Sequence, residues 1–193
     1  MKSAKPKLTA KQYLEADRGA GRLSEYSNGE LYELPPATVT HSQILINTVL
    51  ALKPQIAAIP ATIVASSVRV CVQGSAIYTY PDIAVTVGKM QFEDQENDSL
   101  LNPTVLVEIY SRWTANRDLG RKFEWYRDIP SVQNYVAIAE DHLCVTCYTR
   151  LPEKKWMLRD FRKAGGVLEI EAIGSNVPLS EIYRDIELHP EEE

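Results

Sequence analysis

The sequence predicts an α+β fold, α/β-like in places, with a mixed central β-sheet, and three observations support this prediction. The expected elements follow the order helix, hairpin, helix, strand cluster, helix and further strands. No internal repeat, low-complexity segment or linker divides the 193 residues, which are enough for one hydrophobic core. We therefore expect a single domain over residues 1–193, with a short basic tail at the N-terminus and a short acidic tail at the C-terminus.

The first expected elements are a capped helix and a tight hairpin. Thr9 is a typical helix N-cap residue and precedes a helical segment at residues 10–16. Asn28 and Gly29 stand between β-type residues in the segment 25–34, and this dipeptide favours a two-residue hairpin turn. These patterns predict a helix followed by two antiparallel strands.

A second helix and most of the strands follow. Apolar residues at helical spacing predict a helix over residues 40–52, which Pro54 ends or kinks. The pattern then changes to that of strands, interrupted by a polar loop at residues 93–102. The expected strands are 62–66, 68–72, 77–87, 104–111, 134–139, 143–149, 155–161 and 167–172, and the expected later helices are 116–127 and 178–183.

The composition is that of an ordinary water-soluble protein. Hydrophobic residues make up 45% and charged residues 24% of the chain. No stretch approaches the roughly 18 apolar residues of a membrane span, and no apolar signal segment follows the basic start, so we expect a cytoplasmic protein without a membrane partner. Cys71, Cys144 and Cys147 lack the spacing of a zinc site and are expected to be reduced and structural.

The net charge of −5 argues at first against a nucleic-acid partner. Four of the 26 acids lie in residues 187–193, however, and without them 22 acids face 21 bases. A nearly neutral body is compatible with a local basic groove but does not indicate one.

Two acids stand inside apolar, strand-like runs. Asp82 begins the run 81–87, and Glu108 lies within the run 105–110, where strand alternation places it on the same face as Leu106 and Tyr110. Burying a carboxylate is costly unless a cation or hydrogen-bond donors meet it. A divalent metal shared by both acids would supply that partner and would give the chain a hydrolytic centre.

Short motifs around these acids occur in a fixed order along the chain. They are Glu25-Tyr26-Ser27-Asn28-Gly29-Glu30-Leu31, His41, Tyr80-Pro81-Asp82-Ile83-Ala84-Val85, Val107-Glu108-Ile109-Tyr110-Ser111, Asp118, Lys122-Phe123-Glu124-Trp125-Tyr126, Ile129-Pro130-Ser131-Val132 and Asn134-Tyr135. Each motif alone is weak. The ordered set, over residues 8–186, resembles the PD-(D/E)XK nuclease superfamily and, more closely, the Uma-two family of bacterial restriction-endonuclease-like proteins.

The resemblance implies a restriction-endonuclease-like fold, in which helices flank the mixed sheet and Asp82 and Glu108 bind Mg²⁺ or Mn²⁺. The superfamily pattern has a lysine two residues after the strand acid, where this chain has Tyr110. The Uma-two pattern moves that lysine to the following helix, which here implies Lys122. A second departure is Ser111-Arg112-Trp113-Thr114, where the family usually has a Ser-Pro-Ser-Thr type of turn, so the lip of the site is expected to differ.

A helical wheel at 100° per residue is compatible with a role for Lys122. The lysine lies about 60° from the centre of the apolar stripe, with Asp118 one turn earlier beside it. A lysine at the edge of a stripe is expected to contribute only about 0.3–0.5 kcal/mol to stability. The stripe consists of Leu119, Phe123 and Tyr126, and the opposite, solvated side is expected to hold Arg117, Arg121 and Glu124.

Other candidate residues leave alternatives open. Glu25 and Glu30 flank the hairpin turn, and either is a candidate third carboxylate, with a solvated hairpin pair as the alternative. His41 either caps the following helix or lies near the site. Arg112 and Arg121 are candidate substrate contacts within a group of bases that could equally be an ordinary solvated face. That group contains Arg112, Arg117, Arg121, Lys122 and Arg127, and a second group contains Arg150, Lys154, Lys155, Arg159, Arg162 and Lys163.

The sequence therefore predicts an Mg²⁺- or Mn²⁺-dependent endonuclease that hydrolyses DNA phosphodiester bonds. Asp82 and Glu108 would hold the metal, Lys122 would position the attacking water, and Glu30 or Glu25 would assist. The alternatives are a binding or assembly module with little activity and a nuclease that acts on RNA. Self-association as a homodimer is also expected, because the later part of the chain has many strand-like segments and aromatic residues, such as Tyr148 and Trp156, that are predicted to be exposed.

Overall fold

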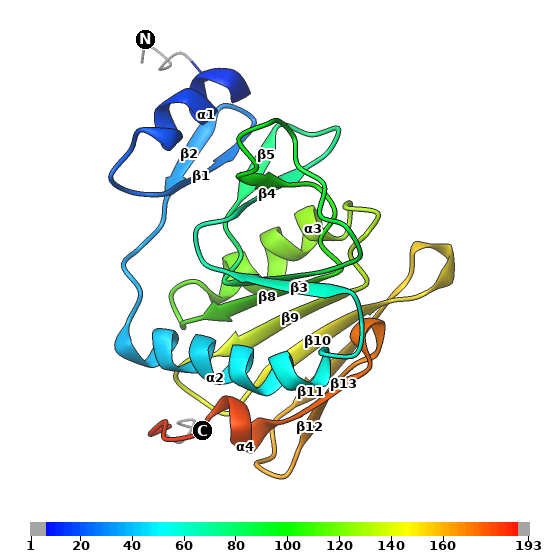
Figure 1. Ribbon diagram of the computed structural model, residues 1–193. Coiled ribbons are helices and arrows are strands. Elements are labelled where there is room, and N and C mark those ends of the chain that lie inside the picture. Colours follow the sequence, from blue (N-terminus) through cyan, green and yellow to red (C-terminus); the bar gives the residue numbers. More distant parts are fainter. Residues whose placement is uncertain (1–6, 189–193) are drawn as a thin grey trace.

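A six-stranded mixed β-sheet lies at the centre of the protein (Figure 1). The computed structural model describes residues 7–188. The order across the sheet is β11 (Trp156–Phe161), β10 (Val145–Arg150), β9 (Asn134–Ala139), β8 (Val105–Tyr110), β6 (Ile83–Val87) and β3 (Ala61–Ala65). β8 and β9 run parallel and all other neighbours run antiparallel, which confirms the predicted mixed sheet.

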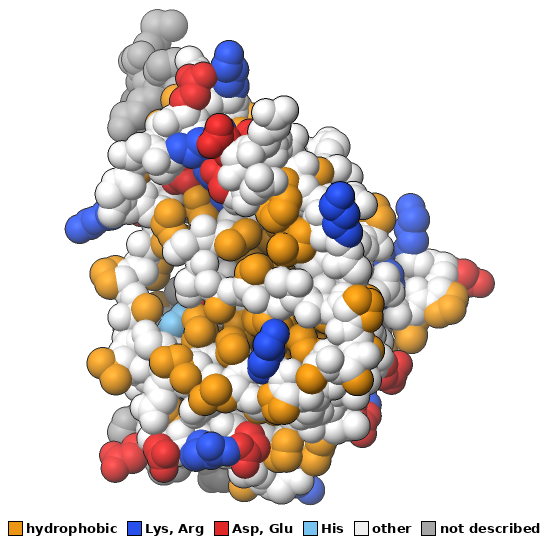
Figure 2. Space-filling model, in the orientation of Figure 1, with side chains coloured by type: hydrophobic (Ala, Val, Ile, Leu, Met, Phe, Trp, Pro, Cys, Tyr) orange, Lys and Arg blue, Asp and Glu red, His pale blue; other side chains and the backbone are white. Residues whose placement is uncertain are grey.

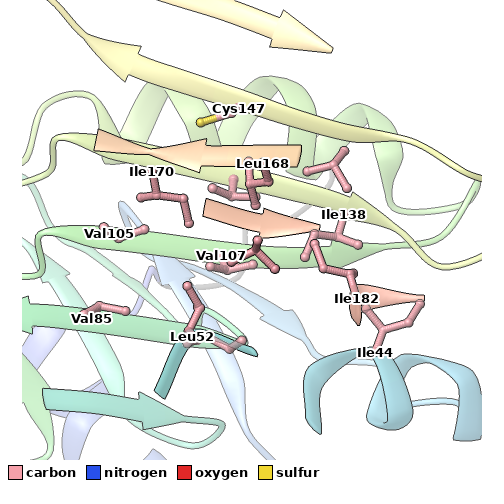
Figure 3. Close-up of a cluster of buried hydrophobic side chains, with 14 of the residues drawn as sticks. Ile44, Leu52, Val85, Val105, Val107, Ile138, Cys147, Leu168, Ile170 and Ile182 are labelled. Atoms are coloured by element: carbon pink, nitrogen blue, oxygen red, sulfur yellow. The ribbon is translucent and has the colours of Figure 1, made fainter. Parts of the chain in front are cut away.

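Helices and a small ribbon cover the two faces of this sheet. One face packs against α2 (Val39–Gln55), α4 (Leu179–Ile182) and the hairpin of β12 (Val167–Ile170) and β13 (Ser175–Pro178). The apolar side chains between these layers form the core shown in Figure 3. The other face carries a helical crossover of η1 (Asn116–Lys122), which has π-helical geometry, and α3 (Phe123–Tyr126). Single 3₁₀ turns occur at η2 (Pro152–Lys154) and η3 (Glu171–Ile173).

Side chains of β8 alternate between the two cores. Val105 and Val107 join the core beneath α2, whereas Leu106 and Tyr110 join the core beneath α3. Glu108 therefore points toward the helical crossover, as strand alternation predicts. The parallel β8–β9 pair requires that crossover, because parallel neighbours cannot be joined by a tight turn.

A second sheet lies beside the first. It contains β2 (Glu30–Glu33), β1 (Ser24–Ser27), β5 (Ile77–Thr79), β4 (Arg69–Val72) and β7 (Ser99–Leu100), and α1 (Ala10–Arg18) packs against β1. Thr9 and Gln12 form a capping box at the start of α1. The predicted hairpin turn is confirmed, since Asn28 and Gly29 have φ angles of 50° and 94°.

The sequence prediction was wrong about three segments. The run 77–87, expected to be one strand, is split between β5 and β6, which lie in different sheets. Pro81 explains the break, because proline has no N–H to donate within a ladder. The expected loop 93–102 contains β7, and β13 was not anticipated. The expected basic and acidic tails fall mainly on residues 1–6 and 189–193, which lie outside the described residues.

Tyr148 is not an exposed aromatic residue, contrary to the sequence prediction. It is 7% exposed, and its ring stacks on Phe123 with centroids 4.1 Å apart. Trp156 is partly buried against the edge of the same phenylalanine and under the guanidinium of Arg150. These residues fill the core beneath α3, so the expected homodimer loses the motive that the sequence suggested and stays an untested prediction.

Exposed apolar side chains occur instead on the outer surface of α2. Val39, Ile46 and Leu50 are 84%, 55% and 62% exposed. Figure 2 shows apolar side chains gathered on this face of the molecule. No helix among residues 7–188 is both long enough and apolar enough to cross a membrane, and the three cysteines are buried and free.

A buried arginine joins α1 to the second sheet. The Arg69 side chain is 3% exposed and forms ion pairs with Asp17 of α1 and with Asp98, which directly precedes β7. Asp98 also accepts two hydrogen bonds from Arg18, of 2.8 and 2.9 Å. The hydroxyl of Tyr80 donates to Asp17, so the same network reaches the segment that leads to Asp82.

Asp98→Asn is expected to lower the free energy of unfolding at neutral pH by about 1 kcal/mol, a small value because the carboxylate remains 30% exposed. The hydrogen bond from Arg18 lowers the pKa of Asp98 to about 2, whereas an unfolded aspartate titrates at about 3.9. The stabilisation by the charged Asp98 carboxylate is complete above the pKa of aspartate in the unfolded chain. It is lost as the pH falls through the lower pKa of Asp98 in the folded protein. Urea unfolding should therefore show the two proteins converging between pH 4 and pH 2; a constant difference would contradict the assignment.

Candidate active site

Asp82 and Glu108 lie opposite each other at the end of the β6–β8 pair. Ile83 is paired with Val107, and continuing this antiparallel register by one residue places Asp82 across from Glu108. The sequence prediction that these acids are neighbours agrees with this register. Glu108 is 3% exposed, whereas the side chain of Asp82 is 18% exposed.

Asp82 is held by two donors. The backbone N–H of Ile109 donates to Oδ2 at 2.7 Å, and His41 Nε2 lies 2.9 Å from Oδ1. His41 comes from the first turn of α2, where Thr38 is the N-cap residue, so His41 does not cap the helix but lies at the site. Burial lowers the pKa of His41, but the hydrogen bond and charge of Asp82, together with Glu140, raise it above its ordinary value.

Glu108 accepts two short hydrogen bonds on one oxygen. Lys122 Nζ lies 2.7 Å from Oε1, and the hydroxyl of Tyr126 donates to the same atom at 2.6 Å. Burial raises the pKa of Glu108 well above its usual range, Lys122 opposes this shift, and the charge of Asp82 adds to it. The carboxylate is thus both the predicted site acid and a member of a buried ion pair.

Lys122 is surrounded by acids. Its Nζ lies 2.7 Å from Glu108, 3.1 Å from Glu25 and 3.7 Å from Asp118, and its side chain is 3% exposed. Burial alone lowers the pKa of a lysine, but these three carboxylates raise the pKa of Lys122. The structure agrees with the predicted position of Lys122 beside Asp118 and facing the sheet. It contradicts the basis for the expected small effect on stability, because the ammonium group is buried and paired.

Glu25 lies in this cluster beside Lys122, and Glu30 does not. Glu25 is fully buried, accepts a hydrogen bond from the N–H of Tyr80 at 3.2 Å, and forms an ion pair with Arg117. Glu30 is exposed and accepts a hydrogen bond from the hydroxyl of Tyr32 at 2.7 Å. The difference follows from the sheet, since β1 lies between β2 and β5 whereas β2 is at the edge.

The predicted substrate contacts lie around this cluster. Arg112 pairs with Asp141 at 2.9 Å and is 59% exposed, and Arg121 lies over the ring of Tyr32 at 5.5 Å. In the second group of bases, Arg150 donates to the backbone carbonyls of Arg127 and Ile129 and so has a structural role. The rest of that group includes pairs with acids: Lys155 with Glu153, Arg159 with Glu169 and Arg162 with Asp160.

Arg117 was expected on the solvated side of the helix, and the structure contradicts this. Its guanidinium pairs with buried Glu25, and its side chain is only 24% exposed. The α-helical wheel fails here because η1 is π-helical, and π-helical hydrogen bonds join residues five apart, as Arg117 and Lys122 are. No pattern in the sequence indicates a π-helix here. Tyr126 was assigned to the apolar stripe, and nothing in that pattern pointed to its bond with Glu108.

The cluster is rich in carboxyl oxygens. Glu25, Asp82, Glu108 and Asp118 supply four carboxyl groups, and the cations among them are Lys122, Arg117 and, when protonated, His41. Carboxylate oxygens are the type of ligand that Mg²⁺ or Mn²⁺ requires. Within residues 7–188, no group of three or more His, Cys, Asp or Glu side chains is arranged so that it could hold a metal ion.

The fold and the site define a restriction-endonuclease-like protein: a mixed sheet flanked by helices, with one acid on β8, a second directly before the adjacent strand β6, and a lysine on the crossover helix. Residues 10–180 match the Uma2 family, described as "Putative restriction endonuclease". The chain belongs to this family, which confirms the resemblance seen in the sequence.

Three related proteins illustrate the likeness. Two are from Synechocystis sp. strain PCC 6803: "Uncharacterized protein sll1609" is 28% identical over 84% of this chain and 92% of its own, and "Uncharacterized protein slr1290" is 24% identical over 94% of each. A solved structure from Anabaena variabilis, described as "a putative nuclease belonging to DUF820", superposes with a TM-score of 0.72 and 17% identity. It covers 91% of this chain and 97% of its own, which shows a shared fold.

Lys122→Ala is expected to lower the free energy of unfolding by about 3–5 kcal/mol, because it leaves Glu25 and Glu108 buried without their ammonium partner. Glu108→Gln should cost much less, since Lys122 keeps two other acids and burial already disfavours the Glu108 carboxylate. Denaturant unfolding of both variants measures the difference between their losses in the free energy of unfolding.

Lys11→Ala is the matched control for that comparison. Lys11 also pairs with an acid one helical turn away, Glu15, but both side chains are exposed, so the loss should be about 0.3–0.5 kcal/mol. If Lys122→Ala cost no more than Lys11→Ala, the buried ion-pair cluster would not exist in solution.

Proposed function

We propose that this protein is an Mg²⁺- or Mn²⁺-dependent nuclease that hydrolyses DNA phosphodiester bonds. The observation that supports this most strongly is that Asp82, directly before β6, lies across from Glu108 of β8, which is joined through Lys122 to a third acid, Glu25. Membership of a family described as "Putative restriction endonuclease" agrees with it. Asp82 and Glu108 would hold the metal. The metal would lower the pKa of a bound water and neutralise negative charge on the phosphate.

The residues around the two acids fix their orientation. The N–H of Ile109 and the ring of His41 hold Asp82 from two sides. The hydroxyl of Tyr126 holds Glu108 and is itself 3.0 Å from the hydroxyl of Thr79. Pre-set carboxylates need little rearrangement during the reaction, which is where much of the catalytic advantage of an enzyme site originates.

Lys122 is the proposed group that orients the attacking water and stabilises negative charge. It is suited to this because three acids raise its pKa and so keep it protonated. Glu25 places it, since the carboxylate binds Lys122 with the same oxygen that accepts the N–H of Tyr80. Through Glu25 and Glu108, Lys122 is anchored to both sheets.

A second candidate function is a binding or assembly module that keeps the nuclease fold with little activity. The observation that favours it is that Asp82 and Glu108 already have partners, His41 and Lys122. Trp113, which is 96% exposed, would then belong to a contact surface.

Cleavage of DNA with Mg²⁺ or Mn²⁺ tests the nuclease proposal. Single-stranded, duplex and branched DNA are each incubated with wild type and with Asp82→Ala, and an RNA of the same sequence forms a further arm. We expect metal-dependent cleavage of at least one DNA substrate by wild type, with activity reduced by about 100-fold or more in Asp82→Ala. Equal cleavage by both proteins would reveal a contaminant and remove the proposal, and cleavage of RNA alone would reassign the substrate.

Calorimetric titration with Mn²⁺ separates the enzyme from the module. We expect wild type to bind the ion at millimolar or lower concentration and Glu108→Gln to bind it more weakly, because a carboxylate ligand is replaced by a neutral amide. Absence of binding by wild type at these concentrations would favour the module.

A further inference from the structure

Three positive charges on η1 differ in exposure. The side chain of Lys122 is 3% exposed, that of Arg117 is 24% exposed, and that of Arg121 is exposed. Together they form a series of increasing exposure on one short helical segment, and its buried member pairs with Glu108.

The β1–β2 hairpin provides the facing partners of this series. Glu25 and Tyr32 are directly opposite each other in the hairpin, so their side chains lie on the same face. Glu25 pairs with Lys122 and Arg117, and the ring of Tyr32 lies under Arg121. η1 and the hairpin therefore meet along a line that leads outward from the cluster.

Arg117 retains unused hydrogen-bonding capacity. A guanidinium has five N–H donors, and the ion pair with Glu25 uses Nη2. Its Nε is buried and has no hydrogen-bond partner among the described residues. Lys122, in contrast, is matched by three acids, so Arg117 is the innermost incompletely paired cation along this line.

We infer that Arg117, Arg121 and Tyr32 form a strip, called here the arginine strip, that binds the phosphate backbone of a nucleic acid on its way to the site. Arg117 contacts the phosphodiester nearest the acids, and Arg121, supported by the ring of Tyr32, contacts the backbone further out. Planar guanidinium groups suit phosphate oxygens, and an aromatic ring beside them is typical of single-strand paths. The identity of the polymer rests on the proposed function, but the strip itself requires only phosphates.

The test is the salt dependence of binding, because each lost phosphate contact lowers the slope of log Kd against log salt by about 1. Fluorescence anisotropy with a labelled 20-nucleotide DNA strand, its duplex and the matching RNA is measured in EDTA at several salt concentrations. Arg117→Gln and Arg121→Gln are compared with wild type. Lys53→Gln is the control, since it removes one positive charge about 18 Å along α2 from His41.

We expect Arg117→Gln and Arg121→Gln each to weaken binding about tenfold and to lower the slope by about 1, with no change in Lys53→Gln. Since Arg117→Gln leaves Glu25 less well paired, the double variant Glu25→Gln/Arg117→Gln is measured as well and should show the same lower slope. Unchanged slopes, or equal changes in Lys53→Gln, would overturn the proposal that the arginine strip binds phosphates. A wild type that binds but does not cleave with metal would refute the nuclease and leave the strip standing.

Discussion

The site depends on one ammonium group buried among carboxylates. Lys122 meets acids from three different elements: Glu25 from β1, Glu108 from β8 and Asp118 from its own helical segment. Removing two charges from water is expensive, so such a cluster persists only when each charge has a partner at short distance. Lys122 thus fixes the distance between the two sheets at the point where the proposed chemistry occurs.

The sequence was informative where a charge interrupted an apolar pattern. Asp82 and Glu108 stand out for this reason, and the alternation of β8 correctly placed Glu108 on the face with Leu106 and Tyr110. Helix starts and the hairpin turn were also predictable, because Thr9 and Asn28-Gly29 act through local backbone geometry. Strand membership was harder: the run 77–87 looks continuous, and only the three-dimensional path shows that it changes sheets at Pro81.

The positions that the sequence misplaced or left open depend either on distant packing or on the type of helix that forms. Nothing local distinguishes Glu25 from Glu30, because the choice rests on which hairpin strand pairs with β5. Arg117 was placed on the solvated side because an α-helical wheel was applied to a segment that is π-helical. Tyr148 was expected at the surface, yet it completes an aromatic stack with Phe123.

The dependence of the site on β1 has a consequence for the order of folding. Glu25 and Arg117 are 92 residues apart in the sequence, and the β8–β9 crossover that carries Lys122 is synthesised long after the hairpin. Contacts between such distant segments form late, because closing a long loop costs entropy before any contact is gained. The carboxylate of Glu25 must therefore stay hydrated in the nascent hairpin until the crossover helix has formed. The N–H of Tyr80 donates to Glu25, so its hydrogen exchange would report when the two sheets have closed over this carboxylate.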